Sequence, residues 1–314
     1  MNHLDLFSGI GGFSLGLKKV FNIKNTYFSD IDKYAIDVFK YNFKKSKYVG
    51  SVTDVQSKEL PKIDIITFGS PCQDFSLAGK RRGLEGQRSS LISEAIRLIC
   101  ECRPSFFIWE NVKGTFSSNN GEDFWAILKE FTNIGGYRLE WQLLNTKWFL
   151  PQNRERIYLV GYIGEGCEGQ IFPITENDEV FNSQIWNNSR KSQSNKNRHT
   201  RTINSSYHKM GSDNTYIKVG DFRYDEGLRW RQDNNSPTLT LKSNEVLIKS
   251  CPKIRRLTPI ECERLQGFPD NWTKHGKELG KISDTQRYKM CGNAVTVNVV
   301  EAVGKKIKDL RYIT

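Results

Sequence analysis

The chain has 314 residues and a formal net charge of +12 at pH 7, with seven cysteines and four histidines. It is long enough to bury a sizeable core without cross-links, as one large domain or two ordinary ones. The cysteines are odd in number with no CxxC pair and the histidines are scattered, so we exclude a disulfide scaffold and a zinc site. No apolar run nears the ~20 residues of a membrane helix, so we exclude membrane insertion and expect a soluble cytoplasmic protein.

Strand-like and helix-like patterns alternate through the first 163 residues. Short β-branched runs predict strands, and apolar residues three or four positions apart predict helices. The predicted strands are residues 3–9, 26–30, 48–55, 63–69, 105–111, 137–145 and 155–163. The predicted helices are residues 12–21, 33–43, 89–102 and 122–135, with two more at 258–266 and 293–310. The alternation is typical of the α/β class, and we expect a Rossmann-like, mostly parallel sheet with helices on both faces.

The composition changes after Gly164. Residues 165 to about 253 are polar, rich in Asn, Ser and Thr, and without helical periodicity. This change indicates a second, smaller and irregular domain that contains β structure. We expect the larger domain to comprise residues 1–164 and 275–314, and the smaller one residues 165–274.

The excess of positive charge suggests a polyanionic partner, although a solvated basic surface explains it equally well. Six Lys or Arg residues and no Asp or Glu lie between positions 181 and 212. Such a stretch fits phosphate contact, and it also fits a plain surface loop.

The segment DLFSGIGGFSLG, residues 5–16, links a predicted strand to a predicted helix through a glycine turn. Without Cβ atoms the backbone can approach a ligand closely. The segment has neither the Gly-Lys-Ser/Thr of a P-loop nor the GxGxxG spacing of a dinucleotide site. Asp30, at the end of a later strand, could accept hydrogen bonds from both hydroxyls of a ribose. A helix cap at Ser29 or Asp30 is the alternative.

Further polar residues stand where predicted strands end. Cys72 follows Pro71 in TFGSPCQDFSLAG, and it therefore starts a loop, where catalytic groups are common. Glu110 ends the strand at 105–111, where it could instead cap the next helix. In QNRER, residues 152–156, alternate side chains should point to one face of a strand, although a solvated edge strand would show the same pattern.

Six ordered motifs give the chain a resemblance to bacterial DNA (cytosine-5) methyltransferases. They are DLFSGIGG at 5–12, SPCQDFS at 70–76, ENV at 110–112, QNRER at 152–156, RRLTPIECERLQGFP at 255–269 and GNAV at 292–295. The resemblance implies the fold of the S-adenosylmethionine-dependent methyltransferases. It also implies that the smaller domain, residues 165–274, is a target-recognition domain, whose variable region is residues 165 to about 253, which lack a family pattern.

The resemblance implies roles for four catalytic residues. The Cys72 thiolate would add to C6 of cytosine and so activate C5 toward an electrophilic methyl group. Glu110 would hydrogen bond the N3 and N4 edge of the base as a general acid, with Asn111 holding the turn that aims it. Arg154 would lie at the cytosine O2 near this acid, and Arg156 would be a structural partner of Glu110 or of the loop.

The methyl donor implied by the resemblance is S-adenosylmethionine. In the family pattern Phe7 packs on its adenine, Asp54 binds its adenine amine and Asp30 binds its ribose. The turn formed by Gly9, Ile10, Gly11 and Gly12 wraps its methionine part, and Asn293 lies at its carboxylate region. The remaining expected cofactor contacts are Ile31, Val55, Gly69, Pro71, Leu91 and Val295. Asp30 replaces the usual Glu and Ile31 the usual aromatic residue, which could weaken cofactor affinity.

The implied activity is methylation of cytosine C5 within a specific sequence of double-stranded DNA, after base flipping and closure of the loop 71–91. A restriction-modification system would add a cognate restriction endonuclease as a possible partner, and we expect a monomer. The alternative function is methylation of RNA (tRNA) by the same fold. A non-catalytic nucleic-acid-binding protein would have a broken nucleophile or acid, and a nucleotide-dependent oxidoreductase would leave SPCQ, ENV and QNRER unexplained.

Overall fold

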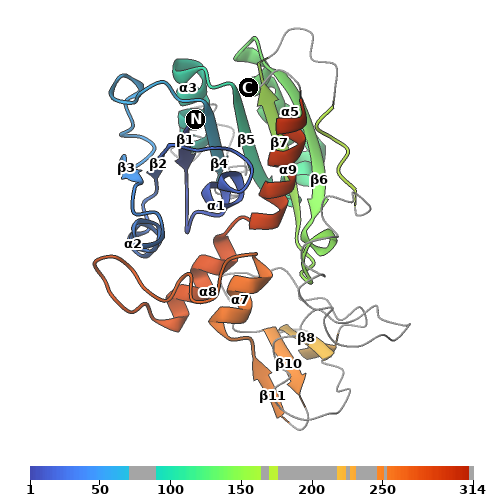
Figure 1. The fold of residues 1–314 in the computed structure, drawn as a ribbon. Helices are drawn as coiled ribbons and strands as arrows, with labels where there is room; N and C mark the ends of the chain where they lie inside the picture. Colours follow the sequence, from blue (N-terminus) through green and yellow to red (C-terminus); the bar gives the residue numbers. More distant parts are fainter. Residues whose placement is uncertain are drawn as a thin grey trace.

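The structure, a computed structural model, describes residues 1–70, 90–163, 170–175, 218–223, 227–230, 246–250 and 253–310. Its central feature is a seven-stranded sheet in the order β3-β2-β1-β4-β5-β7-β6 (Figure 1). The strands are β1 (Asn2–Leu6), β2 (Asn25–Ser29), β3 (Lys47–Tyr48), β4 (Ile65–Gly69), β5 (Phe106–Val112), β6 (Arg138–Asn145) and β7 (Glu155–Tyr162). Strand β7 pairs antiparallel with both β5 and β6, and the other pairs in this sheet are parallel. The predicted α/β class and mostly parallel sheet are confirmed.

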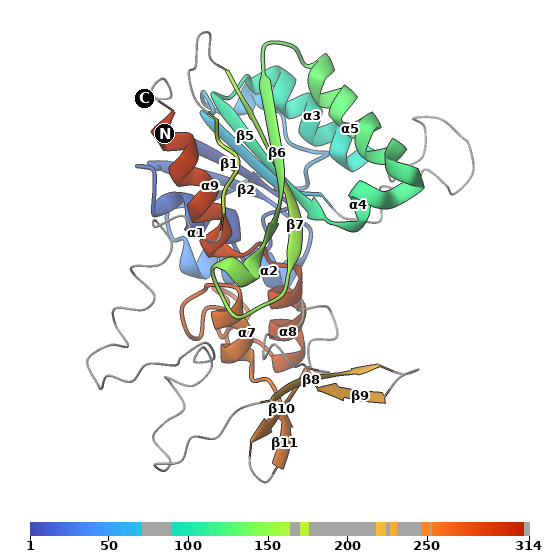
Figure 2. The ribbon, with the colours of Figure 1, turned by 90° about the vertical axis from the view of Figure 1, so that its right-hand side faces the viewer.

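Helices cover both faces of this sheet (Figure 2). They are α1 (Gly12–Lys18), α2 (Lys33–Asn42) and α9 (Val297–Asp309) on one face, and α3 (Ser90–Cys102), α4 (Gly114–Ser117) and α5 (Glu122–Asn133) on the other. Short 3-10 turns occur at η1 (Ser57–Glu59), η3 (Ser118–Gly121) and η4 (Thr146–Trp148). The central strands β1, β4, β5 and β7 are buried on both sides, as expected for a sheet sandwiched between helices.

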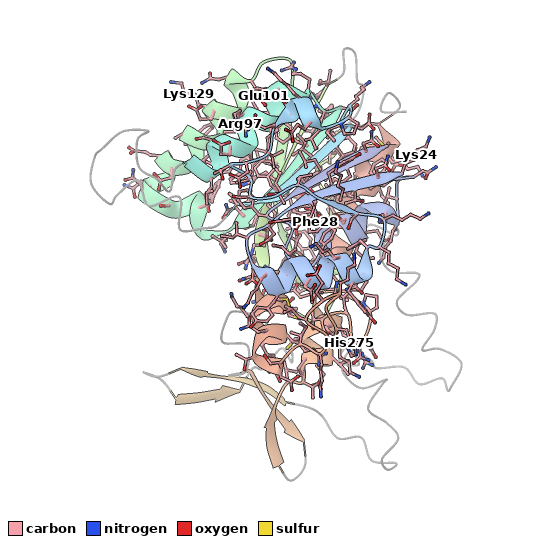
Figure 3. All side chains as sticks on the ribbon, turned by 90° about the vertical axis from the view of Figure 1, so that its left-hand side faces the viewer. Lys24, Phe28, Arg97, Glu101, Lys129 and His275 are labelled. Carbon is pink, nitrogen blue, oxygen red and sulfur yellow. The ribbon has the colours of Figure 1, made fainter. Side chains whose placement is uncertain are left out.

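Alternation along the strands builds two separate core layers. In β4, Ile65 packs with residues of α1 and α9, whereas Ile66 and Phe68 pack with residues of α3 and α5. Phe28 of β2 stacks on Phe39 of α2 with 4.0 Å between ring centroids. Figure 3 shows the side chains, with the buried Phe28 labelled beside α2. Packed side chains on both faces of the sheet therefore support the edge at which the strands end.

The predicted strand at 48–55 is wrong in its extent. Strand β3 ends at Tyr48, and residues 52–54 form a turn. Gly50 has φ +89°, and the Asp54 N–H donates to the Ser51 carbonyl at 2.9 Å. A left-handed glycine turns the chain out of the sheet, although the flanking valines resemble a strand.

A second sheet lies beyond the larger one in the order β11-β10-β8-β9. Its antiparallel strands are β8 (Lys218–Arg223), β9 (Gly227–Trp230), β10 (Val246–Ser250) and β11 (Lys253–Arg256). The expected β structure of the variable region is confirmed, while the proposed domain boundaries stay a prediction. Among the described residues, no helix has the length and apolar character to cross a bilayer.

Two helices connect the small sheet to the large one: α7 (Pro259–Leu265), which was predicted, and α8 (Asp284–Asn293), which was not. A capping box between Thr258 and Glu261 starts α7. Trp272, between the two helices, donates from Nε1 to the Ile10 carbonyl at 2.9 Å. This long-range bond fixes the α7–α8 region to the glycine turn that follows β1.

Candidate active site

The carboxyl ends of β1, β2, β4 and β5 meet at one edge of the sheet, as parallel strands require. After β1 the chain takes three left-handed residues, Phe7 (φ 50°), Gly9 (φ 53°) and Gly11 (φ 87°). A left-handed phenylalanine is strained, and such strain is concentrated at functional sites. A Cβ atom on Gly9 would have no atom of the described residues within 4 Å. The turn is therefore open on the side where a ligand could lie.

Asp30 holds this turn in place. Its Oδ2 accepts from the Gly9 N–H at 2.7 Å, and its Oδ1 accepts from the N–H groups of Ile31 and Asp32 at 2.7 and 2.8 Å. Burial raises the pKa of the Asp30 carboxyl, while these backbone bonds oppose the rise. The cap of α2 is Asp32, which accepts from Tyr34 N–H, so the alternative that Ser29 or Asp30 caps the helix is wrong.

The neighbours of Asp30 differ in exposure. Ile31 is 82% exposed, whereas Val55 is 2% exposed and packs in the core. Asp54 lies exposed on the turn after β3, and its Oδ1 accepts from the Thr53 hydroxyl at 3.1 Å. Tyr48 was missed by the sequence analysis, and its hydroxyl donates to the Asp30 carbonyl at 3.0 Å. Its place at the end of a strand next to β2 is the only signal that could have found it.

The segment 292–296 closes the other side of the glycine turn. A Cβ atom on Gly12 would lie 2.4 Å from the Val295 carbonyl oxygen, so only glycine allows this approach. A Cβ atom on Gly69, at the end of β4, would lie 3.9 Å from Val295 Cγ2. Asn293 is exposed at the end of α8. The structure thus brings together residues predicted from both ends of the chain.

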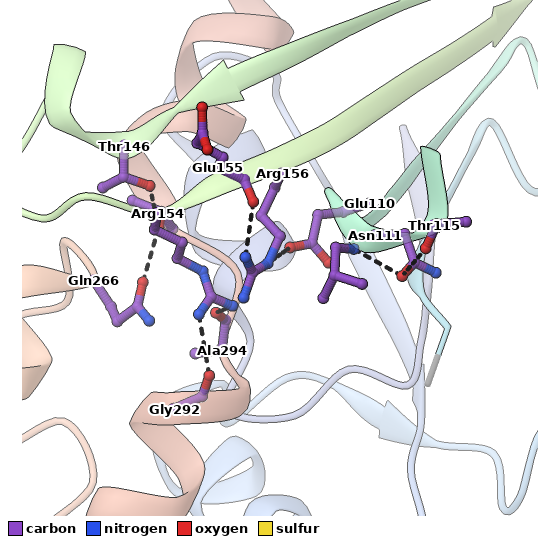
Figure 4. Close-up of polar contacts among 12 residues, drawn as sticks. Glu110, Asn111, Thr115, Thr146, Arg154, Glu155, Arg156, Gln266, Gly292 and Ala294 are labelled. Carbon is purple, nitrogen blue, oxygen red and sulfur yellow. Dashed lines mark hydrogen bonds and ion pairs between the residues drawn. The ribbon is translucent and has the colours of Figure 1, made fainter. Parts of the chain in front are cut away.

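Glu110 lies within β5, in register with Gly69 of β4. It is 8% exposed, and its Oε1 forms an ion pair with Arg156 Nε at 3.3 Å (Figure 4). The next helix, α4, begins at Gly114 after Lys113 and has no side-chain cap. The alternative that Glu110 caps this helix is therefore wrong. Among the described residues, a nearly buried carboxylate thus faces a guanidinium group beside the end of β4.

Ser70, the last described residue before the segment with Cys72, is held from β5. Its hydroxyl oxygen accepts from Trp109 Nε1 at 3.0 Å and from Asn111 Nδ2 at 3.1 Å. Asn111 in turn accepts from Thr115 at 3.1 Å. These bonds fix the exit of β4 beside Glu110. Trp109 was not predicted to have this role.

Three predicted site residues concern the segment after β4. Pro71 and Cys72 lie outside the described residues. Leu91 is half-buried in α3 and packs on the core. The contacts expected of the loop 71–91 with the base or the DNA stay predictions.

The two arginines of QNRER lie in different surroundings. Strand β7 begins only at Glu155, so the expected single strand face is wrong for Gln152 and Arg154. Arg154 is 3% exposed and donates to the carbonyls of Gly292 and Ala294, so the solvated-edge alternative is wrong too. Arg156 pairs with Glu110, as expected of a structural partner. A contact of Arg154 with the cytosine O2 stays a prediction.

Arg154 keeps its charge in spite of burial. Its pKa is lowered to about 10, first by burial and then by the neighbouring charge of Arg156, while Glu110 opposes the change. The side chain is therefore a cation at neutral pH. In the part of the chain that the structure describes, two adjacent guanidinium groups therefore lie beside the Glu110 carboxylate.

A buried polar ring beneath the site was not predicted. His3 Nε2 lies 2.7 Å from the Thr67 hydroxyl, which donates to Asp5 Oδ1 at 3.1 Å. Ser14 donates to Asp5 Oδ2 at 2.6 Å and lies 3.5 Å from His3 Nδ1. Burial raises the pKa of Asp5 to about 7 and lowers that of His3 to about 3. The ring joins β1, α1 and β4 immediately below the strand ends.

Comparison with known proteins places the chain among DNA methylases. The family described as C-5 cytosine-specific DNA methylase matches residues 1–309. The chain is 32% identical over 315 residues to the Type II methyltransferase M.Bsp6I of Bacillus sp. (strain RFL6), covering 96% of each chain. It is 32% identical over 324 residues to M.HaeII of Haemophilus aegyptius, covering 99% of this chain and 94% of that relative. The chain belongs to the C-5 cytosine-specific DNA methylase family.

Solved structures agree with this fold. The S. pombe Dnmt2 methyltransferase has a TM-score of 0.66 at 19% identity, covering 99% of this chain and 100% of that one. The Entamoeba histolytica methyltransferase EhMeth has a TM-score of 0.65 at 19% identity, covering 98% of each chain. At such identity these likenesses establish the fold alone.

Proposed function

We propose that this member of the C-5 cytosine-specific DNA methylase family transfers a methyl group from S-adenosylmethionine to C5 of cytosine within a specific sequence of double-stranded DNA. The observation that carries the proposal is the pair of Glu110 and Arg156 at the end of β5. This pair lies beside Gly69 and Ser70, where the segment with Cys72 begins. Family membership over residues 1–309 supports the same chemistry.

Glu110 and Arg156 would bind and polarise the base. In its protonated form Glu110 donates to cytosine N3 while a thiolate adds at C6, so negative charge does not accumulate in the ring. Arg156 contacts Glu110 through Nε and the Glu155 carbonyl through Nη1, at 3.3 and 2.8 Å. Held at both atoms, the guanidinium keeps the carboxyl group aimed in one direction.

Cys72 would be the nucleophile. Its thiolate forms an Sγ–C6 bond, which makes C5 nucleophilic, and C5 then takes the methyl group. Loss of the C5 proton to water, cleavage of the Sγ–C6 bond and return of the N3 proton to Glu110 restore the aromatic ring, the thiolate and the acid. This role rests on the SPCQDFS motif and the family, because Cys72 lies outside the described residues.

The residues at the ends of β1 and β2 fit S-adenosylmethionine, which when bound supplies the electrophilic methyl group. The open side of Gly9 leaves room for a ligand against the backbone. Asp30 presents a carboxylate at the strand end beside it, suited to a ribose. Val295, Asn293 and Leu91 would border the donor. Phe7 and Ile31 would flank its adenine.

DNA recognition would fall to residues 165–274, which include the small antiparallel sheet. The net charge of +12 favours a polyanionic substrate. Relatives named Type II methyltransferases favour a restriction-modification system, in which a cognate endonuclease would cut unmethylated sites. We expect the protein to act as a monomer.

The direct test is to incubate the protein with S-adenosylmethionine and unmethylated DNA, and to map 5-methylcytosine by bisulfite sequencing. Methylation confined to one sequence would support the proposal and identify the target. Modification of tRNA in place of DNA would establish the RNA alternative. No modification of either substrate by a folded protein would contradict both.

A further inference from the structure

The end of helix α8 is held by a side chain that is far away in the sequence. The last carbonyls of a helix have no partner within the helix. Here Arg154 Nη1 donates to the Gly292 carbonyl at 3.2 Å, and Nη2 donates to the Ala294 carbonyl at 2.9 Å (Figure 4). These pairs are 138 and 140 residues apart in the sequence. A positive group at this position also favours the negative end of the helix dipole.

Gln266, the residue that follows α7, holds the same segment. Its Nε2 donates to the Cys291 carbonyl at 2.8 Å, and its Oε1 accepts from the Thr296 hydroxyl at 2.8 Å. The exposed fractions are 3% for Arg154, 0% for Gln266 and 1% for Thr296. Burial of a guanidinium costs several kcal/mol unless its donors are paired. The buried Arg154 side chain therefore needs its two carbonyl partners in place.

The segment that these side chains hold, residues 291–297, forms a wall of the expected cofactor pocket. The Val295 carbonyl touches the position of Gly12, where no Cβ atom would fit. Val295 Cγ2 also approaches Gly69 at the end of β4. A shift of the segment by about 1 Å would change the pocket, since a bound group must fit closely.

We propose that Arg154 is a positioning residue for the cofactor, which keeps residues 291–297 against the glycine turn through the two carbonyls. The inference rests on the proposed use of S-adenosylmethionine. Arg156, two residues further along, serves the other half of the site through Glu110. The two arginines of QNRER thus have separate tasks, one at the cofactor and one at the base.

Cofactor binding without DNA separates this role from a contact with the base. A base contact leaves the DNA-free affinity unchanged, whereas a displaced pocket wall lowers it. Arg154→Lys keeps the charge but lacks the planar fork whose two nitrogens donate to the two carbonyls. Calorimetry with S-adenosylhomocysteine should show about 10-fold or greater loss of affinity, in line with lost hydrogen bonds to a charged group. The matched variant Arg156→Lys should stay within about twofold of the wild type, because it leaves both carbonyl bonds intact.

Hydrogen exchange gives a readout that needs no cofactor. Amides of residues 291–297 should exchange faster in Arg154→Lys than in the wild type, while those of β4 stay unchanged. Thr296→Val, which removes one bond to Gln266, should shift exchange and affinity in the same direction by a smaller factor.

Three results would overturn the inference. One is unchanged affinity for S-adenosylhomocysteine with loss of turnover on DNA, which would assign Arg154 to the base. Another is unchanged exchange in residues 291–297. Global unfolding of Arg154→Lys would assign the residue to general stability. A wild-type protein that binds no S-adenosylhomocysteine would contradict the proposed function, while the exchange result would still test the contact.

Discussion

The two halves of the site hold their carboxylates in different ways. In the cofactor half, Asp30 accepts three bonds from backbone N–H groups. In the base half, Glu110 forms an ion pair with the side chain of Arg156 at 3.3 Å. Backbone donors fix the Asp30 carboxylate through the fold itself, whereas the direction of the Glu110 carboxylate depends on the position of another side chain. The difference suits a ribose ligand that stays in place and a base that must enter and leave.

The strongest test of this comparison is Glu110→Gln. The amide has the size of the carboxyl group and can still form hydrogen bonds, but it cannot donate a proton as an acid. The kcat should therefore fall by about 10²- to 10⁴-fold. Affinity for S-adenosylhomocysteine without DNA should not change, because Asp30 and the glycine turn are untouched. Single-turnover methylation and calorimetry measure the two quantities. Equal losses in both would show that the halves are not separate.

Asp30→Asn tests the cofactor half. An amide offers one acceptor oxygen in place of two, so either Gly9 or the Ile31–Asp32 pair loses its partner. We expect the KM for S-adenosylmethionine to rise by about 10- to 100-fold with kcat little changed. Glu59→Gln, at an exposed carboxylate of η1, is the matched control. A fall in kcat at saturating cofactor would contradict the division between the halves.

The buried ring beneath both halves makes a prediction about stability and pH. His3 has a pKa of about 3 in place of 6.5, so the unfolded chain binds more protons between these values and stability rises with pH there. Asp5 has a pKa of about 7 in place of 3.8, so the folded chain binds more protons and stability falls with pH in that window. From about pH 4 to 6.5 the two slopes oppose each other and should nearly cancel.

Removing one member should expose the slope of the other. In Asp5→Asn the free energy of unfolding should rise with pH between about 4 and 6.5, by up to about 1.4 kcal/mol per pH unit. In His3→Asn it should fall with pH across the same window. Urea unfolding at several pH values measures each slope, independently of the overall destabilisation. Parallel slopes in the wild type and both variants would contradict the opposed titration.

The sequence was sufficient for elements with a local signal. The apolar run before Gly69 and the run before Glu110 predict β4 and β5, and the polar residues after them mark the functional edge. Helix α8 was missed because DTQRYKMCGN lacks apolar residues at helical spacing. The strand at 48–55 was overextended because its valines outweigh the single glycine at position 50.

Contacts between distant segments were beyond sequence reasoning. Nothing near Arg154 indicates that its partners lie 138 and 140 residues later. The pairing of Arg156 with Glu110 was expected only because the motif restricted the choice of acid. A ring of His3, Asp5, Ser14 and Thr67 depends on the register of β1 with β4, which a single sequence does not specify.

The smallest expected effect concerns Tyr48, whose hydroxyl donates to the backbone of Asp30 rather than to its carboxylate. Tyr48→Phe removes one hydrogen bond between neutral groups at the rim of the site, where the residue is 37% exposed. The KM for S-adenosylmethionine should rise by about two- to fivefold, in line with the loss of about 0.5–1 kcal/mol of binding free energy. Tyr41→Phe, on the exposed side of α2, is the control. Because the carboxylate of Asp30 keeps its three backbone donors, the effect must be smaller than that of Asp30→Asn. If Tyr48→Phe weakened binding as much as Asp30→Asn, the backbone bonds would not be what fixes the cofactor half.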